Sequence, residues 1–239
     1  MSAALALDHV VIVVRDLDAV VAAYRAAGFT VAPGGRHPGR NTRNALVVFA
    51  DGAYLELIAY DAPSPDERWW RVLEAHGEGL VDFALLPQDI SGVVAAARAR
   101  GLAGLAERPG SRARPDGLQI AWQSARPASS DLPFLCSDLT PRALRVPEGE
   151  VRLHANGALG IAEVRVAARD LAATLARYRA YLGEECIVDG AVPLAAARIT
   201  FSEERDNSRD EGPCEVRLRY DSPDGGEGRV EALDVAPLR

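Results

Sequence analysis

The hydrophobic positions of this chain follow one pattern that occurs three times. Residues 10–26 read VVIVVRDLDAVVAAYRA and residues 164–180 read VRVAARDLAATLARYRA, with nine of seventeen positions identical. A fainter copy lies 73 residues after the first. Each copy begins with an apolar, β-branched run that predicts a strand, and then continues with an apolar face at helical spacing. Repeats of this kind predict a fold built from similar modules.

Each predicted helix has clear start and stop signals. An aspartate precedes it in every copy, at Asp16, Asp89 and Asp170. A carboxylate at this position accepts the free N–H groups of the first helical turn. Glycine follows each helix, where a left-handed residue can end it. The repeated segment is therefore a strand followed by a capped helix.

Extended segments follow each predicted helix and complete a module of about 55 residues, in the order β-α-β-β-β. In the first module they are 29–32, 44–50 and 53–60. The second module has a strand at 80–86, a helix at 90–100, and strands at 118–124 and 133–137. The third has a strand at 161–168, a helix at 171–182, and strands at 185–188, 197–202 and 214–220.

Two inserts interrupt the modules and set the predicted domain boundaries. Residues 62–78 predict a helix that starts at Ser64, and residues 138–158 are rich in Pro and Gly with few periodic apolar positions. We predict an α+β protein of tandem βαβββ modules that form curved mixed sheets. Residues 1–140 form a paired two-module domain, 141–156 a linker, and 157–239 a third, partly degenerate module.

Charge and cysteine content narrow the classes of function. The net charge is −7, so we predict neither a nucleic-acid nor a membrane partner. The three cysteines are widely spaced, which argues against a disulfide framework or a zinc knuckle and favours the reducing cytoplasm. The N-terminal apolar run stops at Arg15, so neither a signal peptide nor a membrane span is expected there.

The opening segment LDHVVIVVRDLDAVVAAYRAAGF and the later strand AYLELIAY resemble the first module of the vicinal-oxygen-chelate superfamily, which includes glyoxalase I and the bleomycin-resistance proteins. The stretch HANGALG before the third module is similar to a glyoxalase-like domain branch of it. This resemblance implies that two modules pair into a cup. It also implies that the first and last strands of each module supply ligands to a metal that chelates two neighbouring substrate oxygens.

Carried over to this sequence, the resemblance implies that His9, Glu56 and Asp82 bind a divalent metal such as Mn, Fe, Ni or Zn. Three ligands and a water would make an open catalytic site. The fourth expected position holds Cys136 or Ser137 in place of glutamate, so a cup that binds its ligand without metal is the alternative. Glu56 stands among apolar residues, where a charge needs a partner.

A second group of candidates surrounds the polar loop 34–44, GGRHPGRNTRN. Its basic residues could hold a carboxylate or phosphate by charge-assisted hydrogen bonds, or could simply be solvated. Arg112 and Arg114 lie in the matching loop that we predict at 108–117 in the second module, and they have the same two interpretations, with solvation favoured. The predicted substrate-binding residues are His37, Arg40, Arg43, Asn44 and Trp69.

Three interpretations of the function follow from these candidates. The first is a lyase or isomerase of the glyoxalase type acting on a small oxygen-rich substrate. In it a metal at His9 and Glu56 polarises the substrate, or Glu56 acts as the catalytic base. The alternative is a non-catalytic protein that sequesters a small molecule in the same cup. A third interpretation is a structural module that forms a homodimer around an empty cup.

Overall fold

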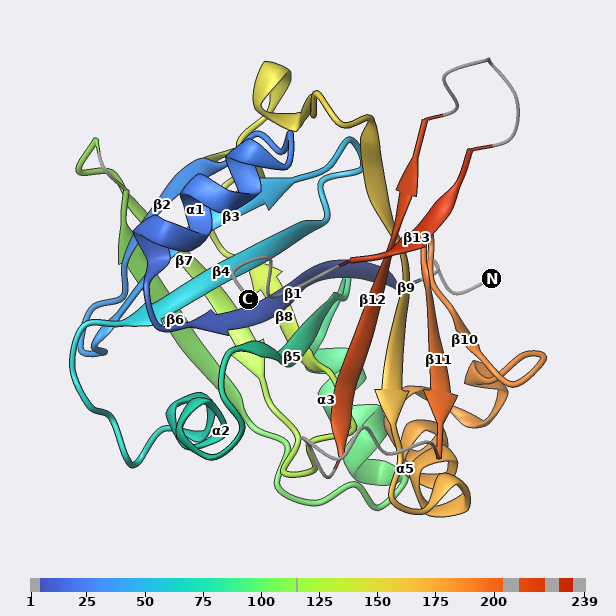
Figure 1. Cartoon of the computed structure of the whole chain (residues 1–239). Helices are drawn as coiled ribbons and strands as arrows, with labels where there is room; N and C mark the ends of the chain where they lie inside the picture. The colour runs from blue at the N-terminus through green and yellow to red at the C-terminus, as the bar shows by residue number, and fades with distance from the viewer. Residues whose placement is uncertain (1–4, 115, 204–210, 222–227, 234–239) are drawn as a thin grey trace.

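The computed structural model describes residues 5–114, 116–203, 211–221 and 228–233. Two β-sheets lie side by side, with helices packed against them (Figure 1). The first sheet has eight strands in the order β2-β3-β4-β1-β5-β8-β7-β6, and the second has five in the order β10-β11-β9-β12-β13. The predicted α+β architecture of curved mixed sheets is confirmed.

The first module supplies half of the large sheet. Its elements are β1 (Ala6–Val14), α1 (Leu17–Ala26), β2 (Ala32–Arg36), β3 (Thr42–Val48) and β4 (Tyr54–Tyr60). Strand β4 runs parallel to β1 and antiparallel to β3, and β2 forms the edge. The β-α-β-β-β order read from the hydrophobic pattern is the order observed.

The second module supplies the other half. Its elements are β5 (Gly79–Leu86), α3 (Ile90–Ala99), β6 (Glu107–Ala113), β7 (Gln119–Ala125) and β8 (Phe134–Asp138). Strand β5 pairs antiparallel with β1 and joins the two halves. The predicted loop at 108–117 was wrong, because most of it is β6. This strand is at the sheet edge, where a proline costs no ladder hydrogen bond.

The third module forms the smaller sheet, seen in orange and red in Figure 1. Strand β11 lies parallel to β9, as β4 does to β1, and β12 pairs antiparallel on the other side of β9. The strand predicted at 185–188 was wrong, since a short 3-10 helix occupies residues 185 and 186 and Val188 forms only an isolated bridge with Ala191. The elements are β9 (Ala158–Ala167), α5 (Leu171–Leu182), η2 (Glu184–Cys186), β10 (Val192–Pro193), β11 (Arg198–Ser202), β12 (Gly212–Tyr220) and β13 (Val230–Ala232).

The three aspartates cap the helices as predicted. Asp16 accepts hydrogen bonds from the backbone N–H groups of residues 18 and 19, while Asp89 and Asp170 each accept one from three residues ahead. The insert helix α2 (Arg68–His76) begins after Glu67, so the predicted start at Ser64 was wrong. None of the helices in the described ranges is long and apolar enough to cross a membrane.

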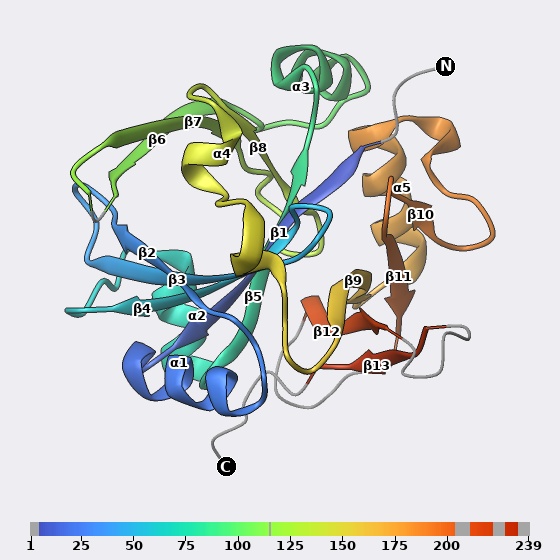
Figure 2. The same cartoon turned by 90° about the horizontal axis from the view of Figure 1, so that it is seen from above.

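The segment predicted as a linker has structure of its own. It contains helix α4 (Arg142–Arg145) and the 3-10 helix η1 (Gly149–Arg152). Figure 2 shows α4 in yellow-green beside the large sheet, before the chain continues into β9. The segment thus connects the two sheets and also packs on the first one.

The two faces of β1 have different surroundings. Val10, Ile12 and Val14 belong to a core that also includes buried residues of the second sheet, so the two sheets share one hydrophobic interior. Val11 and Val13 on the opposite face pack in a smaller cluster with Trp69. This second face carries the polar residues described below.

The large sheet curls until its edge strands β2 and β6 contact each other. Gly35 of β2 allows this approach, because a Cβ there would lie 2.5 Å from the carbonyl oxygen of Ala113. Gly34 allows β2 to pack closely on β3, since a Cβ there would lie 2.0 Å from Asn44 Oδ1. Glycine is therefore required at both positions, and the curled sheet encloses a cavity.

Candidate active site

A cavity of about 100 Å³ lies within the curled first sheet. A wider space of about 610 Å³ adjoins it and shares part of its lining. The small cavity is therefore reached through a larger pocket with a mostly polar lining. The lining residues of the small cavity are His9, His37, Arg40, Asn44, Leu46, Tyr54, Glu56, Trp69, Arg112, Trp122, Ser124, Arg126, Phe134, Cys136 and Arg145.

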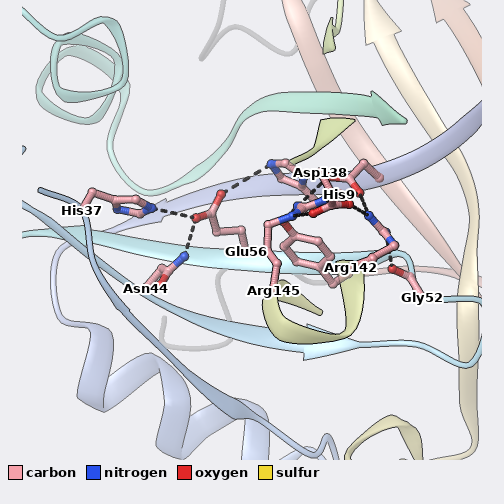
Figure 3. Close-up of polar contacts among 10 residues, drawn as sticks. His9, His37, Asn44, Gly52, Glu56, Asp138, Arg142 and Arg145 are labelled. Carbon is pink, nitrogen blue, oxygen red and sulfur yellow. Dashed lines mark hydrogen bonds and ion pairs between the residues drawn. The ribbon is translucent and has the colours of Figure 1, made fainter. Parts of the chain in front are cut away.

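Glu56 is the central acid of the cavity. Its Oε1 accepts a hydrogen bond of 2.5 Å from Asn44 Nδ2, and its Oε2 lies 3.5 Å from His9 Nε2. His37 Nε2 approaches Oε1 at 3.9 Å from the other side, so the carboxylate lies between two imidazoles (Figure 3). Burial by itself would raise the pKa of Glu56, but His9, His37 and the hydrogen bond from Asn44 outweigh it and lower the pKa. Glu56 is therefore ionised at neutral pH.

Asn44 is held in place by its other contacts. Its Oδ1 accepts a hydrogen bond of 2.9 Å from the backbone N–H of Gly35, which leaves the amide nitrogen directed at Glu56. The strand register places Asn44 close to Glu56. Asn44 of β3 pairs with Ile58 of β4, and Leu46 pairs with Glu56, so Asn44 and Glu56 are diagonal neighbours on one face of the sheet. The close packing of β2 on β3 thus fixes the side chain that holds the carboxylate.

His9 is fixed on both faces and at one nitrogen. Its ring stacks on Tyr54 with centroids 4.7 Å apart, and the edge of Phe134 completes the enclosure. Nδ1 donates to Asp8 Oδ2 at 2.7 Å, so Nε2 is the nitrogen that faces Glu56. Neighbouring residues of a regular strand point to opposite faces, but a register shift between Leu7 and His9 brings these two side chains together.

Asp8 is fully buried and is held by two arginines of the segment 141–152. Arg145 donates to both Asp8 oxygens, at 2.9 and 3.0 Å, and Arg142 donates to Oδ1 at 2.6 Å. Both arginines also pair with Asp138 (Figure 3), and Arg145 donates to the Tyr54 hydroxyl at 2.7 Å. Burial would raise the pKa of Asp8, but Arg145 and His9 hold it well below its ordinary value. Asp8 is therefore an anion at neutral pH and lies directly behind His9.

His37 differs from His9 in its partners. Its Nδ1 lies 2.9 Å from Thr42 Oγ1, and its ring meets Trp122 edge-on. Burial lowers the pKa of His37, and the nearby cations Arg40 and Arg112 add to that effect against the pull of Glu56. His37 is consequently neutral at pH 7.

Asp82, the third predicted metal ligand, has other partners. Its carboxylate pairs with Arg126, accepts a hydrogen bond of 3.0 Å from Trp69 Nε1, and lies 3.6 Å from Arg68. His9 and Glu56 are brought together, whereas Asp82 does not line the cavity. In the described part of the chain, no three His, Cys, Asp or Glu side chains form a group that could hold a metal ion. The donor set does not fit the metal centre implied by the resemblance.

The remaining predicted residues divide in the same way. His37, Arg40, Asn44 and Trp69 line the cavity. Arg40 pairs with Glu67 and lies over the Trp69 ring. Arg43 lies outside the cavity and pairs with acids on the outer surface, because Asn44 points inward and successive strand residues face opposite sides.

Several cavity residues could not be identified from the sequence as functional. Arg112 and Arg126 come from the second module, Trp122 from β7, and Arg145 from the predicted linker. Arginine clusters at 108–114 and 142–145 were the available signal, but solvation explains such clusters equally well. His154 is a buried structural residue that contacts the backbone of Thr30 and Val48.

The fold and the cavity define a class of protein in which two βαβββ modules pair into one cup. The profile of the glyoxalase-like domain family matches residues 7–182, and the chain belongs to that family. No curated protein sequence matches the chain significantly.

Two of the similar solved structures share the fold of this chain. A hypothetical protein from Staphylococcus aureus is 16% identical with a TM-score of 0.63, over 83% of this chain and 87% of that one. A xylose isomerase-like TIM barrel/4-hydroxyphenylpyruvate dioxygenase fusion protein is 17% identical with a TM-score of 0.53, over 91% of this chain and 36% of that one. Methylmalonyl-CoA epimerase from Mycobacterium tuberculosis is 21% identical over 58% of this chain and 91% of its own, with a TM-score of 0.41.

Proposed function

We propose that this protein is an enzyme of the isomerase or lyase type that moves a proton on a small, oxygen-rich molecule, with Glu56 as the base. The observation that carries the proposal is the ionised Glu56 carboxylate, buried in a cavity and held by Asn44. An ionised carboxylate that is buried in a cavity and held in one orientation is placed to accept a proton from a bound molecule.

The reaction follows from these positions. Glu56 Oε2 takes a proton from a carbon next to a carbonyl group, and the electron pair of the broken C–H bond moves onto the carbonyl oxygen to give an enolate. Return of the proton to the same carbon regenerates the substrate and is detected only as exchange with solvent. In a hydroxyketone or hydroxyaldehyde the hydroxyl proton of the first carbon moves to the former carbonyl oxygen, and the carboxylic acid delivers its proton to the neighbouring carbon, which completes an isomerisation. If a group on the next carbon leaves with its electron pair instead, the reaction is an elimination.

Neighbouring side chains support this role of Glu56. Asn44 holds Oε1, so Oε2 is the oxygen free to react. The His9 imidazole is fixed by Asp8 and by its stacking on Tyr54, and its Nε2 lies 3.5 Å from Glu56 Oε2. A substrate oxygen next to Glu56 would therefore lie beside His9, and the arginine N–H groups that line the cavity would donate hydrogen bonds to the developing oxyanion.

No step of this reaction is routed through a divalent metal. His9 and Glu56 would be two of its ligands, but the Asp82 carboxylate is taken up by Arg126 and Trp69. The cavity instead contains four arginine side chains, which can hold oxygen-rich groups by charge-assisted hydrogen bonds.

Proton exchange with solvent tests the proposal. The purified protein is incubated in D₂O with a panel of small ketones, hydroxyketones, aldehydes and 2-oxo acids, and loss of the C–H signal is followed by ¹H NMR. We expect exchange above the buffer rate for at least one compound, with a loss of roughly 10²-fold or more in Glu56→Gln, as general-base catalysis contributes 10²–10⁴-fold.

Glu163→Gln is the matched control, because Glu163 is equally buried but pairs with Arg198 and Thr200 in the second sheet. Exchange that survives Glu56→Gln would contradict the assignment of the base. If compounds bind and none of them exchanges, the evidence favours the alternative function of a non-catalytic binding protein.

A further inference from the structure

We propose that Arg112 is the anchor for a carboxylate of the molecule bound in the cavity, so that the substrate class is a small carboxylic acid. This inference rests on the proposed function only in that it treats the bound acid as the substrate. Binding of the acid at Arg112 can be tested without any turnover. The sequence pattern does not distinguish Arg112 from its neighbour Arg114.

Arg112 lies on the edge strand β6 and reaches across the contact between β6 and β2. Its side chain is buried, with the residue only 4% exposed. The guanidinium donates one hydrogen bond of 3.0 Å to the backbone carbonyl of Gly34 and lines the cavity. An arginine has five N–H donors, so most of its donor capacity is not used by that bond.

The other arginines of the cavity each have an acidic partner. Arg40 pairs with Glu67, Arg126 with Asp82, and Arg145 with Asp8 and Asp138. Among the described residues, no carboxylate forms an ion pair with Arg112. The small cavity therefore contains one buried cation whose counter-charge the protein does not supply by direct contact.

Burying a cation without a partner is costly, and buried charges in proteins are normally paired. Burial lowers the pKa of Arg112, against the influence of Glu56 and Tyr54, which is the direction expected for a desolvated cation. An anionic ligand would remove this cost. The fork of a guanidinium matches the two oxygens of a carboxylate, which favours this anion over a spherical one.

The size and lining of the cavity restrict the acid further. A volume of about 100 Å³ equals roughly three times the share of a water molecule in the liquid, so a group of a few non-hydrogen atoms fits. Trp122 and Phe134 supply flat apolar walls, and Glu56 supplies the base. A short acid with a second oxygen next to its carboxylate meets these conditions, and pyruvate is a suitable probe.

Tryptophan fluorescence can follow binding, because Trp69 and Trp122 line the cavity. Pyruvate and its neutral analogue pyruvamide are titrated into the full-length protein. Arg112 also borders a separate groove that Arg114 lines and no tryptophan lines. Arg114→Met is thus the matched control, since it removes a cation from that groove and leaves the cavity intact.

We expect pyruvate to bind the wild type and Arg114→Met alike, and at least about tenfold more tightly than pyruvamide, the value of one hydrogen bond to a charged group. Arg112→Met should lose this preference while its unfolding temperature stays the same or rises, because a buried unpaired charge is removed. Arg112→Lys, which keeps the charge without the fork, should remain folded with a weaker preference.

Equal binding of pyruvate and pyruvamide by the wild type, or a preference for pyruvate that persists in Arg112→Met or Arg112→Lys at full strength, would overturn the assignment. So would an equal loss in Arg114→Met, which would place the anion in the separate groove. If pyruvate binding depends on Arg112 but no compound exchanges protons, only the proposed reaction is contradicted. If proton exchange depends on Glu56 and is unchanged in Arg112→Met, only the role of Arg112 as the anchor is contradicted.

Discussion

The buried cluster behind His9 leads to the most quantitative prediction, the cost of replacing Arg145 by methionine. Arg145 is 5% exposed and makes five hydrogen bonds to Asp8, Asp138 and Tyr54. Without Arg145, the negative charge of Asp8, which has no exposed surface, is balanced by fewer cationic partners. Removing one partner of a buried ion pair costs about 3–5 kcal/mol. Because Arg142 still contacts Asp8, we expect a loss near the lower end, about 3 kcal/mol.

Urea unfolding at pH 7 measures this loss as a change in midpoint at constant slope. Arg142→Met is the matched control, and since the Arg142 side chain is 29% exposed it should lose less, about 1–2 kcal/mol. The double variant with Asp8→Asn should lose less than the sum of its single changes, because the stranded charge is then absent. A loss below about 1 kcal/mol in Arg145→Met would refute the reasoning, since it would mean that Asp8 does not need this partner.

The same cluster predicts a dependence on pH. The folded-state pKa of Asp8 is held well below its ordinary value, so its ionised form stabilises the protein above the unfolded pKa of about 3.9. That contribution disappears as the pH falls from the unfolded pKa toward the folded one. We therefore expect the stability difference between the wild type and Arg145→Met to narrow below about pH 4.

Three further predictions concern the cavity and its walls. Asn44→Leu removes a hydrogen bond that lowers the pKa of Glu56, so this pKa should rise in a ¹³C NMR titration of the carboxyl groups; an unchanged value would contradict the contact. The purified wild type and His9→Ala should both lack stoichiometric metal in elemental analysis, because the third predicted ligand is engaged elsewhere, and metal that is lost only in the variant would reverse this view. Gly35→Ala should lower the unfolding free energy by about 1–3 kcal/mol in urea, as its Cβ would meet a backbone oxygen at 2.5 Å, and wild-type stability would argue against the close approach of β2 and β6.

Local features of the fold were predictable because their causes are local. The aspartate caps and the helix-face residues act within a few positions of one another, so Asp16, Asp89 and Asp170 could be assigned from the sequence. Strand β6 could not, because Pro109 and Gly110 disfavour a strand by propensity and only its place at the sheet edge permits it.

The candidate site shows the same limit. His9 and Glu56 meet because β1 and β4 are neighbours within one module, which the resemblance implied. Asp82 is not available as a metal ligand because it pairs with Arg126. Arg112 is buried without an acidic partner because the edge strands β2 and β6 contact each other. Such pairings are set by tertiary packing between modules, and neither spacing nor composition carries that information.

The ion pair between Asp8 and Arg145 also has a consequence for the order of folding. The two residues are separated by 137 positions, so at synthesis rates of about 5–20 residues per second Arg145 follows Asp8 by roughly 7–27 s. During that interval burial of Asp8 as an anion is costly, because its main counter-charge does not yet exist. The packing of the first βαβββ module around β1 is therefore weaker while this module emerges alone. The cavity with His9 held by Asp8 can form fully only after the nascent chain has been synthesised through α4.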